Sequence, residues 1–149
     1  MGENKTFKNK MEINFLAISE NQAFARVAVA AFATQLNPTI AELTEIKTAV
    51  SEAVTNAMIH GYDDGDEQDK TISLRCVIED REIYIEIEDD GQGIEDIEVA
   101  KEPLYTSKPD DERSGMGFTI MDEFMDALIV ESQAGQGTII KMKKTIETY

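Results

Sequence analysis

Two neighbouring stretches of the chain place an apolar side chain at every second position. The first covers residues 72–78 and the second residues 83–87, with Glu79-Asp80-Arg81 between them. A side-chain period of two is typical of a strand that buries one face. The two stretches therefore predict an antiparallel pair of strands, whose apolar face has to be covered by a second layer of structure.

The flanking segments predict that layer and further strands. Apolar residues recur at helical spacing in three segments, and further strands are expected in three others. The helices are expected over residues 21–35, 38–60 and 117–126, and the strands over 11–15, 128–132 and 138–143. This order predicts an α+β two-layer sandwich, in which about three helices cover one face of a mostly antiparallel, mixed β-sheet.

Two of these helices carry more detailed expectations. In the first, the apolar residues Phe24, Val27, Ala28, Ala31 and Phe32 recur at helical spacing. The second is expected to begin at Asn37-Pro38, with Asn37 as the N-cap and the proline in the first turn.

Length and charge limit the possible functions. The chain has 149 residues, which suits one domain over residues 11–149 after a frayed polar N-terminus at residues 1–10. The net charge of −16 argues against direct binding of nucleic acid. The chain has one cysteine, no apolar run long enough to cross a membrane and no signal peptide, so we expect a cytoplasmic protein without a disulfide or a membrane partner.

Glycines gather at the ends of the expected elements. Six of the nine glycines form three Gly-x-Gly units at residues 91–93, 115–117 and 135–137. The second unit leads into a helix, whose unpaired amides attract phosphate oxygens. Lys108 and Arg113 in the preceding loop are cations that could hold a triphosphate.

Polar residues on the helix over residues 38–60 form another group. Glu52, Asn56 and His60 follow at intervals of four and lie along one side of the helix. A carboxylate beside a carboxamide oxygen suits a magnesium ion, and Asp89 at a strand end suits an exocyclic amine such as that of adenine. Such residues also occur without a ligand, as polar helix surface, ordinary helix caps or turns.

Taken together, these groups resemble the ATP-binding fold shared by gyrase, Hsp90, histidine kinases and MutL (the GHKL or Bergerat fold). The resemblance rests on four motifs in the same order as in that superfamily: Glu52-Ala-Val-Thr-Asn56, Asp89-Asp-Gly91-Gln-Gly93, Gly115-Met-Gly117 and Gly135-Gln-Gly137-Thr138. Residues 43–61 and 112–121 are more closely similar to the anti-sigma-factor serine kinases of spore-forming bacteria.

This resemblance implies a function and a set of partners. It implies a homodimer that binds ATP or ADP with Mg²⁺ and holds a sporulation sigma factor away from RNA polymerase. It also implies phosphorylation of a serine on an anti-anti-sigma partner of the STAS type.

The resemblance also implies roles for individual residues. Asn56 would bind Mg²⁺, Glu52 would act as the base towards the substrate serine, and Arg113 would stabilise charge on the transferred phosphoryl group. Asp89 would bind the adenine amine, with Thr138 beside it. The other residues expected to contact the nucleotide are His60, Gly91, Gly93, Thr106, Ser107, Lys108, Ser114, Gly115, Met116 and Gly117.

Three other functions are compatible with parts of this pattern. A histidine-kinase catalytic domain would need a phosphoacceptor histidine on a separate helical hairpin, and the single His60 lies beside the Glu52–Asn56 motif instead. A nucleotide-gated binding module without transferase activity would need no base at Glu52. An acidic structural domain with chance motifs would bind no adenine nucleotide.

Overall fold

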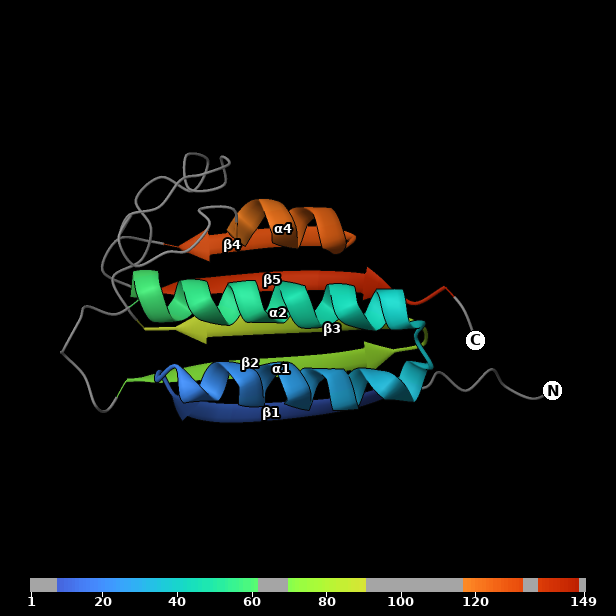
Figure 1. The fold of residues 1–149 in the computed structure, drawn as a ribbon, viewed down its shortest axis with the longest axis horizontal. Coiled ribbons are helices and arrows are strands. Elements are labelled where there is room, and N and C mark those ends of the chain that lie inside the picture. Colours follow the sequence, from blue (N-terminus) through green and yellow to red (C-terminus); the bar gives the residue numbers. More distant parts are fainter. Residues whose placement is uncertain (1–7, 62–69, 91–116, 133–136, 148–149) are drawn as a thin grey trace.

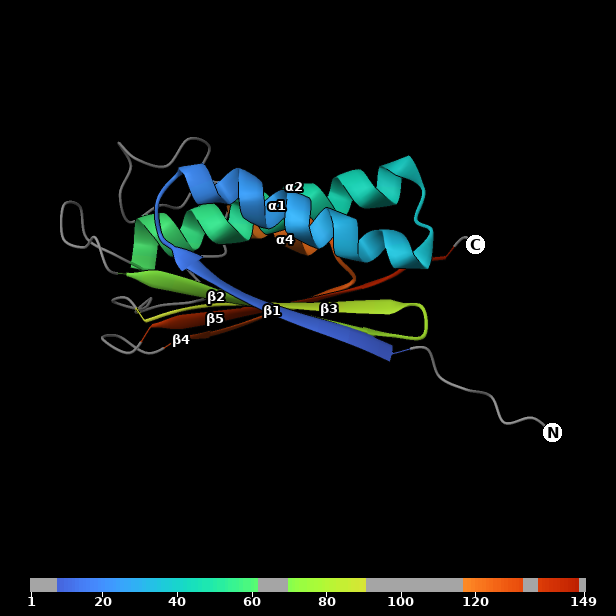
Figure 2. The same cartoon turned by 90° about the horizontal axis from the view of Figure 1, so that it is seen from below.

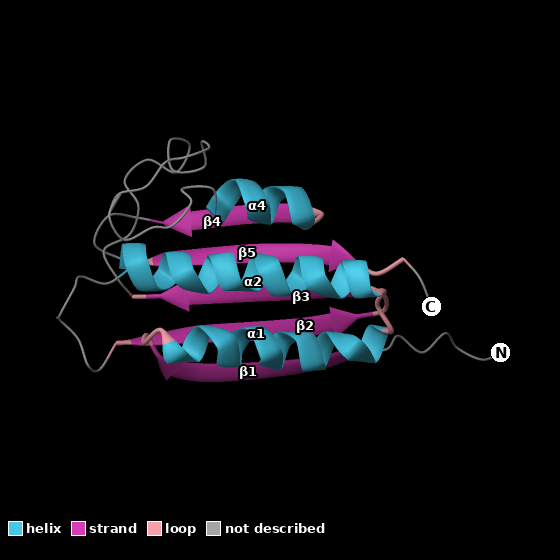
Figure 3. Ribbon diagram, in the orientation of Figure 1, coloured by secondary structure: helices cyan, strands magenta, loops and turns pink. Residues whose placement is uncertain are grey.

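The computed structural model describes residues 8–61, 70–90, 117–132 and 137–147. Within these ranges the elements follow the predicted order (Figures 1 and 3). They are β1 (Lys8–Leu16), α1 (Glu20–Ala33), the short 3-10 helix η1 (Thr34–Leu36), α2 (Ile40–Gly61), β2 (Thr71–Glu79), β3 (Glu82–Asp89), α4 (Gly117–Phe124), β4 (Ala127–Ser132) and β5 (Thr138–Thr145).

The strands form one five-stranded sheet in the order β1-β2-β3-β5-β4. Every pair of neighbouring strands is antiparallel. The described sheet is therefore antiparallel throughout, whereas a mostly antiparallel, mixed sheet was expected. The three α-helices lie on one face of this sheet, as Figure 2 shows edge-on. The predicted α+β two-layer architecture is therefore confirmed.

The first strand is longer than the sequence pattern indicated. It begins at Lys8, and Lys8–Lys10 pair with Val77–Glu79 of β2. The frayed end expected for residues 1–10 was therefore wrong for Lys8–Lys10, because backbone pairing with β2 fixes these polar residues although they bury little side-chain surface.

The alternation over β2 and β3 gives the sheet its buried face. Ile72, Leu74, Ile85 and Ile87 are almost fully buried under the helices. Helix α1 faces this core through Ala25, Val29 and Ala33, whereas Phe24 and Val27 are 51% and 60% exposed. The helical spacing of apolar residues therefore predicts α1 without identifying its buried side, because apolar residues lie on both sides of the helix.

Helix α2 begins two residues later than expected. Asn37 has a φ of 52° and ends η1, so it does not cap α2. Thr39 does, because its hydroxyl accepts a hydrogen bond from the Glu42 amide while the Glu42 carboxylate accepts one from the Thr39 amide. This reciprocal pair is a capping box, and its Thr-x-x-Glu pattern outweighs the Asn-Pro signal.

A buried lysine ties three elements together. Lys144 of β5 is 7% exposed, and its Nζ donates to the Phe124 carbonyl oxygen at the end of α4 and lies 2.9 Å from a Glu45 carboxylate oxygen of α2. A cation at a helix C-terminus also interacts favourably with the negative end of the helix dipole. Lys144 therefore helps to fix α4 against α2.

We predict that Lys144→Met lowers the free energy of unfolding by about 1–3 kcal/mol, because it removes both interactions from a buried position. The matched control is Lys141→Met on the same strand, where Lys141 pairs with the half-exposed Glu131 at the surface. That change is expected to cost less than about 0.5 kcal/mol. Urea denaturation measures both, and equal losses would contradict the role of Lys144.

We predict that Cys76 reacts with a thiol reagent at pH 8 only when the protein unfolds. Burial raises the pKa of this thiol to about 12, so the reactive thiolate is scarce in the folded state. The unfolded chain loses this proton at lower pH, so the contribution of Cys76 to stability declines as the pH rises above about 9. Rapid labelling without denaturant would contradict the burial of Cys76.

Candidate functional site

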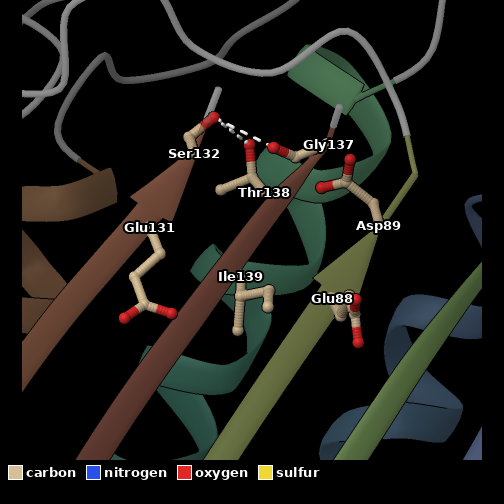
Figure 4. Close-up of a pocket in the computed structure, with 7 residues that line it drawn as sticks. All are labelled: Glu88, Asp89, Glu131, Ser132, Gly137, Thr138 and Ile139. Atoms are coloured by element: carbon tan, nitrogen blue, oxygen red, sulfur yellow. Dashed lines mark hydrogen bonds between the residues drawn. The ribbon is translucent and has the colours of Figure 1, made fainter. Parts of the chain in front are cut away.

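Three polar side chains form a row across the end of the sheet, where β3 and β4 end and β5 begins. In the strand register Asp89 faces Thr138, and Thr138 faces Ser132. Asp89 and Thr138 are 5% and 7% exposed. The row lines a pocket together with Gly137 (Figure 4). The structure therefore brings two predicted site residues, Asp89 and Thr138, side by side.

Gly137 allows β5 to start this close to β3. Its φ of 88° is a conformation that favours glycine, and a Cβ at this position would overlap the carbonyl oxygen of Asp89. This is the one position in the third Gly-x-Gly unit that lies in the described residues. This close approach of the two backbones keeps Asp89 and Thr138 opposite each other on neighbouring strands.

Ser132 links the members of this row by hydrogen bonds. Its hydroxyl donates to the Gly137 carbonyl oxygen at 3.1 Å and lies 2.8 Å from the Thr138 hydroxyl oxygen. The dashed lines in Figure 4 show both contacts. Ser132 was missed in the sequence, because its contacts with Gly137 and Thr138 join β4 to β5 and a single sequence does not show them.

The other carboxylates of β3 near this end point to the opposite face of the sheet. There Arg75 of β2 contacts Glu86 at 3.0 Å and Glu88 at 2.9 Å. These hydrogen bonds, the one to Glu88 most of all, raise the pKa of Arg75 above its ordinary value. Asp89 is the acidic residue of β3 that lies on the helix-covered face, whereas Glu88, which also lines the pocket, is paired with Arg75.

A second group lies where α2 meets the start of α4. A Cβ built on Gly117 would lie 2.7 Å from Asn56 Nδ2 and 3.3 Å from a Glu52 carboxylate oxygen. The structure thus brings together three predicted site residues, Glu52, Asn56 and Gly117. A side chain at position 117 would require the Asn56 carboxamide to shift, so glycine fits the close approach of α4 to this part of α2.

The Asn56 carboxamide is buried, and its hydrogen-bonding capacity is not fully satisfied by the described residues. Asn56 is 5% exposed, and its Nδ2 has no hydrogen-bond partner in the part of the chain that the structure describes. An unpaired buried polar group costs about 1–3 kcal/mol, and amide nitrogen and oxygen exchange places by a flip of the side chain. The residues present therefore fit a hydrated cation or a phosphate oxygen beside Asn56.

Figure 1 shows that both groups lie at the same end of the molecule. The C-terminal end of α2, the end of β3 and the start of β5 lie there, and α4 begins on the same side of the molecule, set in from this end. Among the described residues, no group of three His, Cys, Asp or Glu side chains is placed to hold a metal by itself.

The remaining predicted site residues lie outside the described part of the chain. His60 belongs to α2, but its side chain is not described. The others outside the described residues are Gly91, Gly93, Thr106, Ser107, Lys108, Arg113, Ser114, Gly115 and Met116. Their roles stay predictions.

The described helices do not include one that is both long and apolar enough to cross a membrane.

Comparison with known proteins agrees with the fold and the motifs. Residues 17–144 match the family described as histidine kinase-like ATPase domain. The chain is 60% identical over 137 residues to the anti-sigma F factor of Clostridium acetobutylicum, which covers 92% of this chain and 94% of that protein. It is 55% identical to the anti-sigma F factor of Geobacillus kaustophilus over 93% of this chain and 94% of the relative.

A solved structure shares the fold. It contains the RsbU and RsbW domains of a protein from Mycobacterium tuberculosis, with a TM-score of 0.63 and 12% identity. The match covers 95% of this chain and 33% of that longer chain. From the family match over most of its length and the high identity to these relatives, the chain belongs to the anti-sigma F factors of the histidine kinase-like ATPase family.

Proposed function

We propose that the chain binds ATP or ADP with Mg²⁺ at the end of the sheet where Asp89, Thr138, Asn56 and Gly117 lie. The observation that supports this most is the buried Asn56 carboxamide, whose Nδ2 lacks a partner among the described residues directly beside Gly117. Asp89 and Thr138 supply polar atoms for a base at the other side of the same end. The family match agrees with a nucleotide as the ligand.

Each residue has a distinct part in this proposal. Asn56 binds the magnesium ion through its carboxamide oxygen, and Asp89 accepts a hydrogen bond from the adenine amino group. The bound nucleotide supplies the phosphoryl group that is transferred. Outside the described residues, Thr106, Ser107, Lys108, Ser114, Gly115 and Met116 contact the phosphates, and Arg113 stabilises their charge.

The proposed reaction is phosphorylation of a serine on a STAS-type anti-anti-sigma protein. Glu52 lies one helical turn before Asn56, and its carboxylate is close to Gly117 at the start of α4. Glu52 accepts the proton of the serine hydroxyl while the new O–P bond forms and ADP leaves. The chain would thus be a serine/threonine protein kinase as well as an anti-sigma factor.

The proposed regulatory role is to hold a sporulation sigma factor away from RNA polymerase. It is supported by the family of anti-sigma F factors to which the relatives belong. The net charge of −16 fits a protein partner with a basic region better than direct contact with nucleic acid.

We also propose that the chain forms a homodimer through the outer face of α1. Phe24 and Val27 are more than half exposed there, and the neighbouring Ala23 and Ala31 are also exposed. Large apolar side chains at helical spacing on one surface are typical of an interaction site.

We predict different losses from Asn56→Ala and Glu52→Gln. Asn56→Ala should raise the Kd for Mg·ATP roughly 10-fold or more, because a cation ligand is lost. Glu52→Gln should leave that Kd nearly unchanged while slowing serine phosphorylation by roughly 10²-fold or more, because the amide cannot accept the proton. Calorimetry and transfer of labelled phosphate to a STAS-type protein measure the two effects.

The matched control for both variants is Thr44→Ala, an exposed change on the same helix. Equal losses of binding and transfer in both variants would contradict the separate roles. If the unchanged protein binds ATP and a sigma factor but transfers no phosphate, the chain is instead a nucleotide-gated binding module.

We predict that Val27→Asp converts the dimer to monomers, because it places a charge in a dry contact. Ile129→Asp on β4 is the matched control, since Ile129 is 54% exposed compared with 60% for Val27. Sedimentation velocity measures the oligomeric state. A monomeric unchanged protein would rule out the dimer, and dissociation by Ile129→Asp alone would rule out the α1 face.

A further inference from the structure

The two hydrogen-bond contacts of Ser132 with Gly137 and Thr138 together favour one direction. A carbonyl oxygen only accepts, so the contact with Gly137 uses the single proton of the Ser132 hydroxyl. The two hydroxyl oxygens of Ser132 and Thr138 lie 2.8 Å apart, and one proton has to lie between them. The arrangement that satisfies both contacts is donation from Thr138 to Ser132 and from Ser132 to Gly137.

The direction of this chain determines what Thr138 offers to a ligand. With its proton directed to Ser132, the Thr138 hydroxyl presents lone pairs on its other side. Thr138 faces Asp89 in the strand register, and the Asp89 carboxylate is also an acceptor. Figure 4 shows Asp89 and Thr138 at the same end of their neighbouring strands, on the lining of one pocket.

We propose that Ser132 is a positioning residue that makes Thr138 an acceptor, so that the site selects a 6-amino purine over a 6-oxo purine. This inference rests on the proposed binding of a nucleotide and goes further, because it gives a specificity role to a residue that acts through Thr138. An amino group carries two N–H donors, and two adjacent acceptors match it. A 6-oxo group carries only lone pairs and is repelled by the same two acceptors.

Removal of the Ser132 hydroxyl releases the Thr138 proton. In Ser132→Ala, the Thr138 hydroxyl has lost its acceptor and is able to turn its proton towards the ligand. That proton opposes an amino group and favours a carbonyl oxygen. The variant therefore binds ATP less tightly and ITP relatively better, whereas a purely structural defect would weaken both nucleotides equally, since they share the ribose and the triphosphate.

The test is calorimetric titration of the whole chain with Mg·ATP and with Mg·ITP. For Ser132→Ala, we expect the preference for ATP over ITP to fall roughly 3- to 10-fold, the range for one neutral hydrogen bond. Ser132→Thr keeps the hydroxyl and should restore the preference. The matched control is Ser73→Ala, which removes another strand hydroxyl that is hydrogen-bonded to Asn14, on the uncovered face of the sheet.

The outcomes separate the two proposals. If the unchanged protein binds neither nucleotide, the proposed function fails and this inference fails with it. If the unchanged protein prefers ATP and thermally stable Ser132→Ala keeps the full preference, or weakens both nucleotides equally, the role of Ser132 is overturned while ATP binding stands. The same fall in preference for Ser73→Ala would also overturn it.

Discussion

The strand register at one end of the sheet determines where the polar side chains of the site lie. The hydrogen-bond ladders between β3, β5 and β4 place Asp89, Thr138 and Ser132 in one row on the helix-covered face. A shift of one residue would turn each side chain to the opposite face. The register is held by the buried isoleucines of β3 and by the backbone contact of Gly137 with Asp89.

The helices complete the same end of the molecule. Lys144 connects β5 to the end of α4 and to Glu45 of α2, and at its other end α4 begins with Gly117 directly beside Asn56. The fold thus leaves Asn56 Nδ2 buried without a partner among the described residues, a cost that a bound ligand can offset. The packing of α4 against α2 therefore both stabilises the core and buries Asn56 at this end.

The architecture could be predicted from the sequence because its strands alternate clearly and its elements follow one another in a simple order. The row of Asp89 and Thr138 and the group of Glu52, Asn56 and Gly117 were also predicted as site residues, and the structure brings together the members of each group. The buried side of α1 was not predictable from periodicity, because apolar residues such as Phe24 lie on both of its sides. Ser132 was missed because its role depends on a cross-strand contact that a single sequence does not display.

The central claim is that the α2–α4 group and the row across the sheet belong to one nucleotide site. A crystal structure of the chain with Mg²⁺ and a non-hydrolysable ATP analogue tests it most directly. If both groups form one site, the adenine amino group lies on Asp89 beside Thr138, and the magnesium ion lies on the oxygen of Asn56. A nucleotide bound elsewhere, or bound with Asn56 and Asp89 contacting different molecules, would contradict it.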